Sequence, residues 1–230
     1  MASIKLEKQE SVYVLNLING DQDNTLNNAV LDEYIDAFDR IEADKENASL
    51  IIQSSHDKTF CNGIDLPWLM TQSPDGFRDF ITRLEGFFVR LALLNLPVIA
   101  SINGNCYAGG AIIASACDFR FMREDRGRFC FSEVKIKMPF TPAMLDVINL
   151  LPNKHALWEM ALTANAYGGF ECLRRQVVDH IYTIENLSFE SMKFAEEMAS
   201  KHRPTYATIK RGLRKDLVKL ALERGILKHA

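Results

Sequence analysis

The segment from Val98 to Met122, VIASINGNCYAGGAIIASACDFRFM, constrains the fold of this chain more than any other segment. It opens with an apolar run of five residues, Val98–Ile102, which is long enough for a buried strand and too short to span a membrane. Two glycine-containing pairs, Asn103-Gly104 and Gly109-Gly110, then interrupt the apolar pattern. The segment therefore predicts a strand, a turn, a buried helix over about 111–117 and a second strand over 118–122.

The Gly109-Gly110 pair allows two interpretations. Glycines permit a left-handed or closely packed backbone, so their N–H groups can remain unpaired just before a helix begins. Donors in that place suit a negative charge that develops on an oxygen atom. The pair can also serve only to pack a helix closely on a sheet, and for an isolated glycine pair that interpretation is favoured.

The composition describes an ordinary globular protein of one domain, or of one domain with a small appendage. The 230 residues are 47% hydrophobic and 25% charged, which is enough to bury a sizeable core. The net charge of −3 and the isoelectric point near 6.0, with no basic run mixed with aromatic residues, argue against nucleic acid as a partner. No apolar stretch reaches the roughly 18 residues of a membrane span, so we expect no membrane partner.

The cysteine and histidine residues indicate neither a disulfide framework nor a metal site. The five cysteines are an odd number without a CxxC pair, and the five histidines have no metal-ligand spacing. Residues 1–10 contain no apolar signal core. We therefore expect a cytoplasmic protein with reduced thiols and no bound metal, and the sequence leaves an organelle lumen open as an alternative.

The first half of the chain alternates strand and helix patterns. Residues 11–18 and 49–54 read as strands, the first ending in a hairpin or turn at Asn19-Gly20. Asn27 is a suitable N-cap for an amphipathic helix, and a second apolar stripe predicts a helix over 75–95. A second glycine turn, Cys61–Asp65, follows the strand over 49–54. This order is typical of α/β crossover units, in which ligands bind at the carboxyl ends of strands, so both glycine turns should face one crevice.

The second half reads as mainly helical. We expect a helix that starts at Thr141-Pro142 and continues through Leu151, a helix over 155–162, a helix capped by Ser188 that runs through Ser200, and a basic helical stretch over 204–228. The basic stretch is a solvated face by default, and it could instead meet a phosphate-bearing ligand or another subunit. Glu133 follows an aromatic strand pattern over 129–131, and on surface statistics alone it would be a solvated side chain.

Three motifs together resemble the crotonase superfamily, the enoyl-CoA hydratase and isomerase family: FCNGIDL at 60–66, INGNCYAGGAIIASACDFRFM at 102–122, and FSEV at 131–134. The resemblance covers nearly the whole chain. It implies an α/β fold, a crotonase-like spiral of ββα units over 1–185, with a helical C-terminal trimerisation region over 186–230. It further implies an acyl-CoA substrate, no separate cofactor, and a homotrimer or a dimer of trimers.

The resemblance also implies roles for individual residues. The oxyanion-hole N–H groups would come from Ile64 and Gly109, and Glu133 would be the catalytic base. The residues expected at the substrate-binding site are Gly63, Asp65, Leu66, Trp68, Gly110, Ile112 and Phe140.

One position separates the activities within the family. Hydratases of the family carry one glutamate three residues after the oxyanion glycine and a second one further on; here these positions hold Ile112 and Glu133. Addition of water is helped by two carboxylates, whereas moving a double bond requires one proton shuttle. The text FMREDRGRFCFSEV is most similar to the plant-type and peroxisomal Δ3,Δ2-enoyl-CoA isomerases.

We therefore expect a Δ3,Δ2-enoyl-CoA isomerase. A hydratase, thioesterase, decarboxylase or non-catalytic acyl-CoA-binding protein is the alternative. The chain departs from the family pattern in the segment KIKMPFTPAM and at Gln176, where glycine is usual. The first departure affects the shape of the acyl pocket and the chain length that it accepts.

Overall fold

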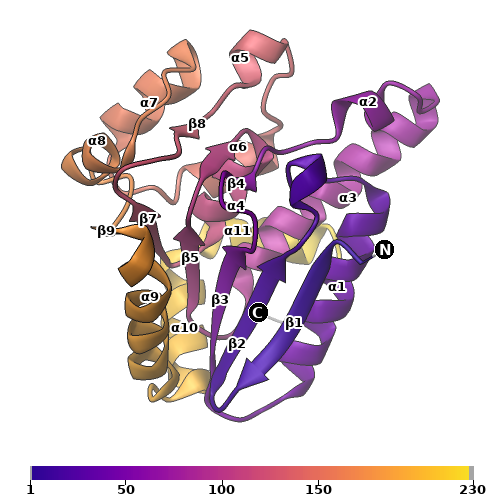
Figure 1. Ribbon diagram of the computed structural model, residues 1–230. Coiled ribbons are helices and arrows are strands. Elements are labelled where there is room, and N and C mark those ends of the chain that lie inside the picture. Colours follow the sequence, from indigo (N-terminus) through magenta and orange to yellow (C-terminus); the bar gives the residue numbers. More distant parts are fainter. Residues whose placement is uncertain (1, 228–230) are drawn as a thin grey trace.

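A computed structural model describes residues 2–227. The larger sheet of this part of the chain has the strand order β1-β2-β3-β5-β7-β9 (Figure 1). The first two strands are antiparallel, and every later neighbour is parallel. The strands are β1 (Ile4–Gln9), β2 (Val12–Leu17), β3 (Ser49–Ser54), β5 (Val98–Ile102), β7 (Phe119–Arg123) and β9 (His180–Tyr182).

A smaller parallel sheet lies at the carboxyl ends of the larger one. It contains β4 (Thr59–Cys61), β6 (Asn105–Tyr107) and β8 (Phe129–Cys130), in that order. Each of β3, β5 and β7 is thus followed by a strand of the smaller sheet and then by one or more helices. This repetition confirms the expected α/β spiral of ββα units.

The helices connect the turns of the spiral and form most of the C-terminal part. The short helix η1 (Gly20–Gln22) is of the 3-10 type. The others are α1 (Asn28–Ala43), α2 (Leu66–Leu69), α3 (Pro74–Leu93), α4 (Gly109–Ala116), α5 (Glu133–Ile136), α6 (Pro142–Ile148), α7 (Lys154–Thr163), α8 (Gly169–Arg174), α9 (Ile184–Ala199), α10 (Arg203–Leu213) and α11 (Lys215–Glu223).

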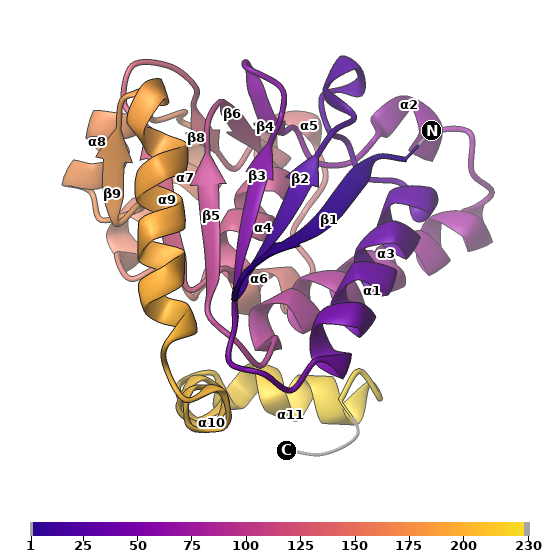
Figure 2. The same cartoon turned by 60° about the horizontal axis from the view of Figure 1, so that its bottom comes forward.

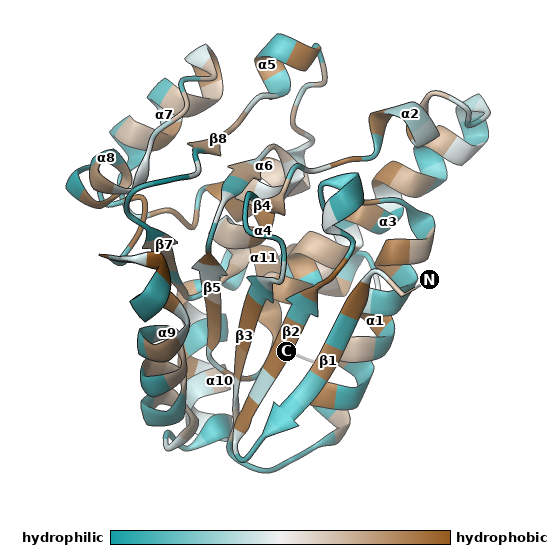
Figure 3. Cartoon of the chain, in the orientation of Figure 1, coloured by the Kyte–Doolittle hydropathy of each residue, from teal (hydrophilic) through white to brown (hydrophobic). Residues whose placement is uncertain are grey.

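Both faces of the larger sheet are covered. On one face, side chains from β2, β3, β5 and β7 pack against Leu187 and Ala195 of α9. The other face belongs to the main core, to which α1, α3 and α4 contribute. Figure 2 shows α9 along the sheet, with α10 and α11 across its lower end. Hydrophobic residues concentrate on the inner strands, while β1 and α9 present hydrophilic ones (Figure 3). Strands that are buried along their whole length, such as β5, follow from this double coverage.

The structure confirms several helices that the sequence predicted. The Asn27 side chain accepts a hydrogen bond from the Val30 N–H at 3.1 Å and caps α1. The expected helix over 75–95 is α3, capped by Ser73. The helix expected over about 111–117 is α4, which begins two residues earlier, at Gly109, because the glycine pair forms its first turn.

Of the two alternatives predicted at Asn19-Gly20, a hairpin or a turn, the structure has the turn. The strand over 11–18 is β2, but Asn19-Gly20 leads into η1 rather than into a hairpin. The hairpin instead joins β1 to β2 through Glu10, which has a φ of +52°. The charged residues of β1 lie at the sheet edge and hid its strand pattern.

The C-terminal helices also differ from expectation. The helix through Ser200 begins at Ile184 rather than at Ser188, with Thr183 as its N-cap residue. The stretch expected as one helix over 204–228 is divided at Arg214 into α10 and α11, and residue 228 lies outside the described residues. The expected boundary between 185 and 186 falls in the first turn of α9, and the division into two regions stays a prediction.

Candidate active site

The first glycine turn connects β4 to α2. Gly63 has a φ of +85°, a conformation that favours glycine. Its carbonyl oxygen accepts the N–H of Leu26 at 2.8 Å, and the carbonyl of Leu26 accepts the N–H of Asp65 at 2.9 Å. Within residues 2–227, the N–H of Ile64 between them donates to no protein atom. Leu26 therefore holds the backbone on both sides of Ile64, and the N–H of Ile64 stays free.

The second glycine turn connects β6 to α4. Ala108 has a φ of +46° and places Gly109 at the first position of the helix. The first N–H groups of a helix have no partner within it, and the N–H of Gly109 finds none in the described part of the chain. Every residue of α4 is buried, and its N-terminal end, the positive end of the helix dipole, lies at the site.

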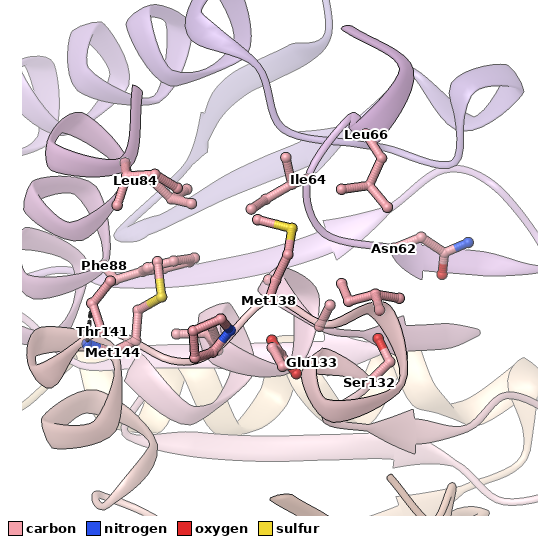
Figure 4. Close-up of a pocket in the computed structure, with 16 residues that line it drawn as sticks. Asn62, Ile64, Leu66, Leu84, Phe88, Ser132, Glu133, Met138, Thr141 and Met144 are labelled. Atoms are coloured by element: carbon pink, nitrogen blue, oxygen red, sulfur yellow. Dashed lines mark hydrogen bonds between the residues drawn. The ribbon is translucent and has the colours of Figure 1, made fainter. Parts of the chain in front are cut away.

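Both turns border one cavity of about 120 Å³. Figure 4 shows side chains from the first turn, α3 and the 132–144 segment around it. The residues that line it are Asn62, Ile64, Leu66, Ile81, Leu84, Phe88, Ala108, Gly109, Ile112, Ser132, Glu133, Ile136, Met138, Pro139, Thr141 and Met144. The wall is thus largely apolar, with two free backbone donors among its residues.

Glu133 is the one carboxylic acid among the described residues that line this cavity. It is the first residue of α5 rather than part of a strand, and it is only 7% exposed. Its Oε2 atom has no hydrogen-bond partner in the described residues. Burial raises the pKa of Glu133 to about 7, against the lowering effect of a hydrogen bond from its own backbone N–H. A carboxyl group with this pKa can accept and return a proton near neutral pH.

The family model for enoyl-CoA hydratase/isomerase matches residues 7–228. The chain belongs to this family. The resemblance inferred from the three motifs is thereby confirmed.

The curated proteins that are similar to this chain include isomerases and a hydratase. "Enoyl-CoA delta isomerase 3" of Arabidopsis thaliana is 27% identical over 223 residues, which cover 94% of this chain and 93% of the relative. "Crotonyl-CoA hydratase" of Syntrophomonas wolfei is 29% identical over 201 residues, covering 86% and 76% of the two chains. Membership alone therefore does not distinguish the two activities.

Solved structures of the family confirm the fold. A family protein from Pseudomonas syringae superposes with a TM-score of 0.87 at 20% identity, covering 99% of this chain and 98% of that one. A probable enoyl-CoA hydratase from Mycobacterium tuberculosis gives a TM-score of 0.87 at 23% identity, covering 97% and 93%.

The structure brings five of the residues expected from the sequence to the cavity wall: Ile64, Leu66, Gly109, Ile112 and Glu133. Ile112, at the position where hydratases of this family carry a glutamate, is apolar and 2% exposed. The wall therefore offers one carboxyl group rather than two.

The other expected residues lie outside the lining and have supporting contacts. The Asp65 carboxylate accepts the N–H of Trp68 at 3.0 Å and caps α2, and the Trp68 ring packs edge-on against Phe80. A Cβ atom at Gly110 would lie 2.1 Å from the carbonyl oxygen of Cys61, so Gly110 permits close packing of the two turns. Gly63 likewise contributes its backbone conformation.

Phe140 lines a separate open groove, which shares Glu133, Met138 and Pro139 with the cavity. Its ring packs edge-on against that of Phe131, which is fully buried. Phe140 therefore supports the outer side of the 133–140 segment rather than the cavity itself.

Several lining residues were missed from the sequence. Ile81, Leu84 and Phe88 of α3 lie at helical spacing and belong to the apolar stripe that predicted this helix, but the stripe does not tell which turn meets the cavity. Asn62 is a further omission, as are Ala108, Ser132, Ile136, Pro139, Thr141 and Met144. The Oδ1 atom of Asn62 is buried and has no partner among the described residues.

The described residues contain no cluster of metal ligands, and their cysteine thiols are buried. No group of three or more His, Cys, Asp or Glu side chains between residues 2 and 227 is placed to hold a metal ion. All five cysteines are buried. Burial raises the pKa of Cys61, Cys117 and Cys172 to about 12, which makes them poor nucleophiles at neutral pH. No helix in the same range combines the length and apolar character needed to cross a bilayer.

Proposed function

We propose that this protein is a Δ3,Δ2-enoyl-CoA isomerase, which moves the double bond of an acyl-CoA thioester from position 3 to position 2. The observation that carries the proposal is the single carboxyl group of Glu133 in a cavity where Ile112 occupies the other position at which hydratases carry a glutamate. Two Arabidopsis relatives named as enoyl-CoA delta isomerases, 27% and 28% identical, support it.

The reaction needs one base that acts twice. The Glu133 carboxylate removes a proton from C2, and the electron pair of that C–H bond moves into the thioester carbonyl to give a dienolate. Glu133 then returns the same proton to C4, so that the C3–C4 double bond becomes a C2–C3 double bond. No atom is gained or lost, and no cofactor takes part.

The dienolate oxygen would be stabilised by the N–H groups of Ile64 and Gly109. Both groups are without a protein partner in the described residues and belong to residues that line the cavity. One such donor is worth about 3 kcal/mol to a transition state in which charge develops on oxygen. The apolar wall excludes water, which strengthens these hydrogen bonds and keeps the pKa of Glu133 raised.

The test is an assay of the purified protein against paired 3-enoyl-CoA and 2-enoyl-CoA thioesters. Conversion of the 3-enoyl to the 2-enoyl isomer appears as a rise in the absorbance of the conjugated thioester. Glu133→Gln should lower kcat by at least about 100-fold, because the proton shuttle is lost, while CoA binding is retained. A wild-type protein without isomerase activity, or a fully active Glu133→Gln variant, refutes the proposal.

The same panel distinguishes the alternatives. Hydration of 2-enoyl-CoA as fast as isomerisation would indicate a hydratase. Release of free CoA would indicate a thioesterase, and loss of carbon dioxide from a carboxyacyl-CoA would indicate a decarboxylase. Binding without any turnover would indicate a non-catalytic acyl-CoA-binding protein.

We further expect a homotrimer or a dimer of trimers. Large apolar side chains are exposed on the C-terminal helices, among them Leu213 at 82%, Ile209 at 58% and Phe189 at 64%. Exposed apolar side chains clustered on a surface are typical of subunit contacts. Light scattering coupled to size-exclusion chromatography measures the assembly, and a monomer at micromolar concentration would contradict this expectation. The cytoplasmic location stays a prediction.

A further inference from the structure

The two ends of helix α4 have different roles. Its N-terminal end provides the free N–H of Gly109 at the cavity, and its residues are all buried. Its C-terminal end must find partners for carbonyl oxygens that have none within the helix. Those partners come partly from the C-terminal region, which lies far along the chain from the catalytic motifs.

Arg214, at the junction of α10 and α11, binds the C-terminal end of α4. Its Nη1 atom donates to the carbonyl oxygen of Ala116 at 3.1 Å. The same atom donates to the carbonyl of Ala92, in the last turn of α3. The Nη2 atom pairs with the Asp118 Oδ1 atom at 2.8 Å, and the Arg214 side chain is only 11% exposed. One guanidinium group thus joins the ends of two helices and the strand connection that follows α4.

The two helices joined by Arg214 both contribute to the cavity wall. Helix α3 contributes Ile81, Leu84 and Phe88, and α4 contributes Gly109 and Ile112. A buried cation at the carbonyl ends of two helices is favourable because their dipoles are negative there. The planar guanidinium also fixes the angle between its partners, which a single ammonium group does not.

Asp118 anchors this arrangement to the central sheet. Its Oδ2 atom accepts the backbone N–H of Val98, at the start of β5, at 2.8 Å. The same oxygen accepts a hydrogen bond from the Lys210 Nζ atom at 2.8 Å. The carboxylate therefore ties Arg214 to β5, the strand that precedes β6 and the second glycine turn.

We propose that Arg214 is a positioning residue for the oxyanion hole: by clamping the C-terminal ends of α3 and α4, it sets where the N–H of Gly109 meets the thioester oxygen. The inference rests on the proposed function. An α-helix of eight residues is only about 12 Å long and resists compression, so a shift at Ala116 is transmitted to Gly109. Displacements of about 1 Å at a reacting group cost about 100-fold in rate.

The matched control is Arg203. It is also a buried arginine of α10, 4% exposed, and its guanidinium donates to the carbonyls of Ile41 and Glu46 and to the Asn95 side chain. None of these partners lies in α3 or α4. Arg203→Gln therefore removes a comparable set of buried hydrogen bonds without touching the proposed clamp.

The experiment compares Arg214→Gln with Arg203→Gln in the full-length protein, in two assays. The first measures kcat and KM for isomerisation of a 3-enoyl-CoA. The second measures the red shift in absorbance when 2,4-hexadienoyl-CoA binds, which reports polarisation of the thioester carbonyl by hydrogen-bond donors and requires no turnover.

For Arg214→Gln we expect kcat to fall by about 10- to 100-fold, with KM changed by less than about threefold, and the red shift to decrease. Arg203→Gln should keep the wild-type kcat and red shift at temperatures below its melting point. A wild-type red shift in Arg214→Gln, or an equal loss in both variants, overturns the proposal.

Two further outcomes remain decisive. If Arg214→Gln does not fold, Arg214→Lys replaces it, and we expect an intermediate red shift because the charge is kept without the planar fork; a wild-type shift in that variant overturns the proposal. If the wild-type protein proves inactive as an isomerase, the proposed function fails. The clamp is then still judged by the red shift alone.

Discussion

A Cβ atom placed on Gly63 would lie 2.6 Å from the backbone nitrogen of Gly109. The two glycine turns, separated by more than forty residues in the chain, therefore touch backbone to backbone. This contact brings the residues that carry the two free N–H groups, Ile64 and Gly109, to the wall of one cavity. A side chain on either turn at this point would separate the turns.

Gly63→Ala should consequently reduce activity and stability together. The φ of +85° is unfavourable for alanine by about 1–2 kcal/mol, and the new methyl group would push against Gly109. We expect kcat to fall by at least about 10-fold, because an oxyanion donor is displaced. Steady-state kinetics and urea unfolding measure the two effects.

Gly212→Ala provides the control for this substitution. Gly212 lies in α10, and a Cβ atom there would have no neighbour within 4 Å. Alanine in a helix is favoured over glycine by about 0.5–1 kcal/mol, so Gly212→Ala should unfold at slightly higher urea with unchanged kinetics. Equal behaviour of the two variants would show that the contact between the turns is unimportant.

The pH dependence of the reaction should follow the ionisation of Glu133. Its pKa is raised to about 7 by burial, and the base must be ionised to remove the C2 proton. We expect kcat/KM to be constant at alkaline pH and to fall about tenfold per pH unit below the pKa of about 7. A profile that stays flat down to pH 5 would exclude Glu133 as the base.

Glu133→Gln should make the protein more stable at high pH while it abolishes activity. A folded-state pKa of about 7, raised from 4.5, means that the neutral carboxyl group is favoured in the folded state. That stabilisation is fully present below pH 4.5 and is lost as the pH rises through about 7. The difference corresponds to about 3 kcal/mol at pH 8.

We therefore expect Glu133→Gln to raise the free energy of unfolding by up to about 3 kcal/mol at pH 8, and not at pH 4.5. Denaturant unfolding at the two pH values measures this. Glu196→Gln, on the exposed side of α9, is the matched control and should change stability by less than about 0.5 kcal/mol at both. A destabilised Glu133→Gln variant at pH 8 would show that the carboxylate is not penalised by burial.

Ile112→Glu should shift the activity toward hydration. Ile112 is 2% exposed on the cavity wall, at the position of the missing hydratase glutamate. A second carboxyl group there can assist the addition of water, so we expect hydration of crotonyl-CoA to rise by about 10- to 100-fold over wild type. Ile112→Gln, of nearly equal size, is the control and should not gain this activity. Equal hydration by both variants would show that the second acid is not what separates the activities.

The sequence predicted the elements whose signals are local. Asn27 and the apolar stripe of α3 defined two helices, and the run Val98–Ile102 defined a central strand. The pattern failed for β1, whose edge position tolerates charged residues on the exposed face. It also failed at Arg214, because this single residue separates α10 from α11 and the nearby Gly212 lies within the helical last turn of α10.

The site was predictable to the extent that it depends on backbone geometry. The glycine turns and Glu133 were found from motifs, and the structure brings their residues to one cavity. Side chains such as Asn62 and Met144 could not be assigned to that wall, because their place depends on how α6 and the first turn pack across the cavity. Trp68 shows the opposite case: its position next to a motif suggested a substrate contact, whereas its ring packs on Phe80.

Because the two proposed oxyanion donors are the main-chain N–H groups of Ile64 and Gly109, only a substitution by proline at these positions can delete them. The groups that would stabilise the negative charge thus depend on the backbone fold. The groups that would move protons are side chains on the cavity wall, which a substitution can change. Divergence of reaction type along such a lineage then requires changes at positions like 112 and 133 and leaves the scaffold untouched.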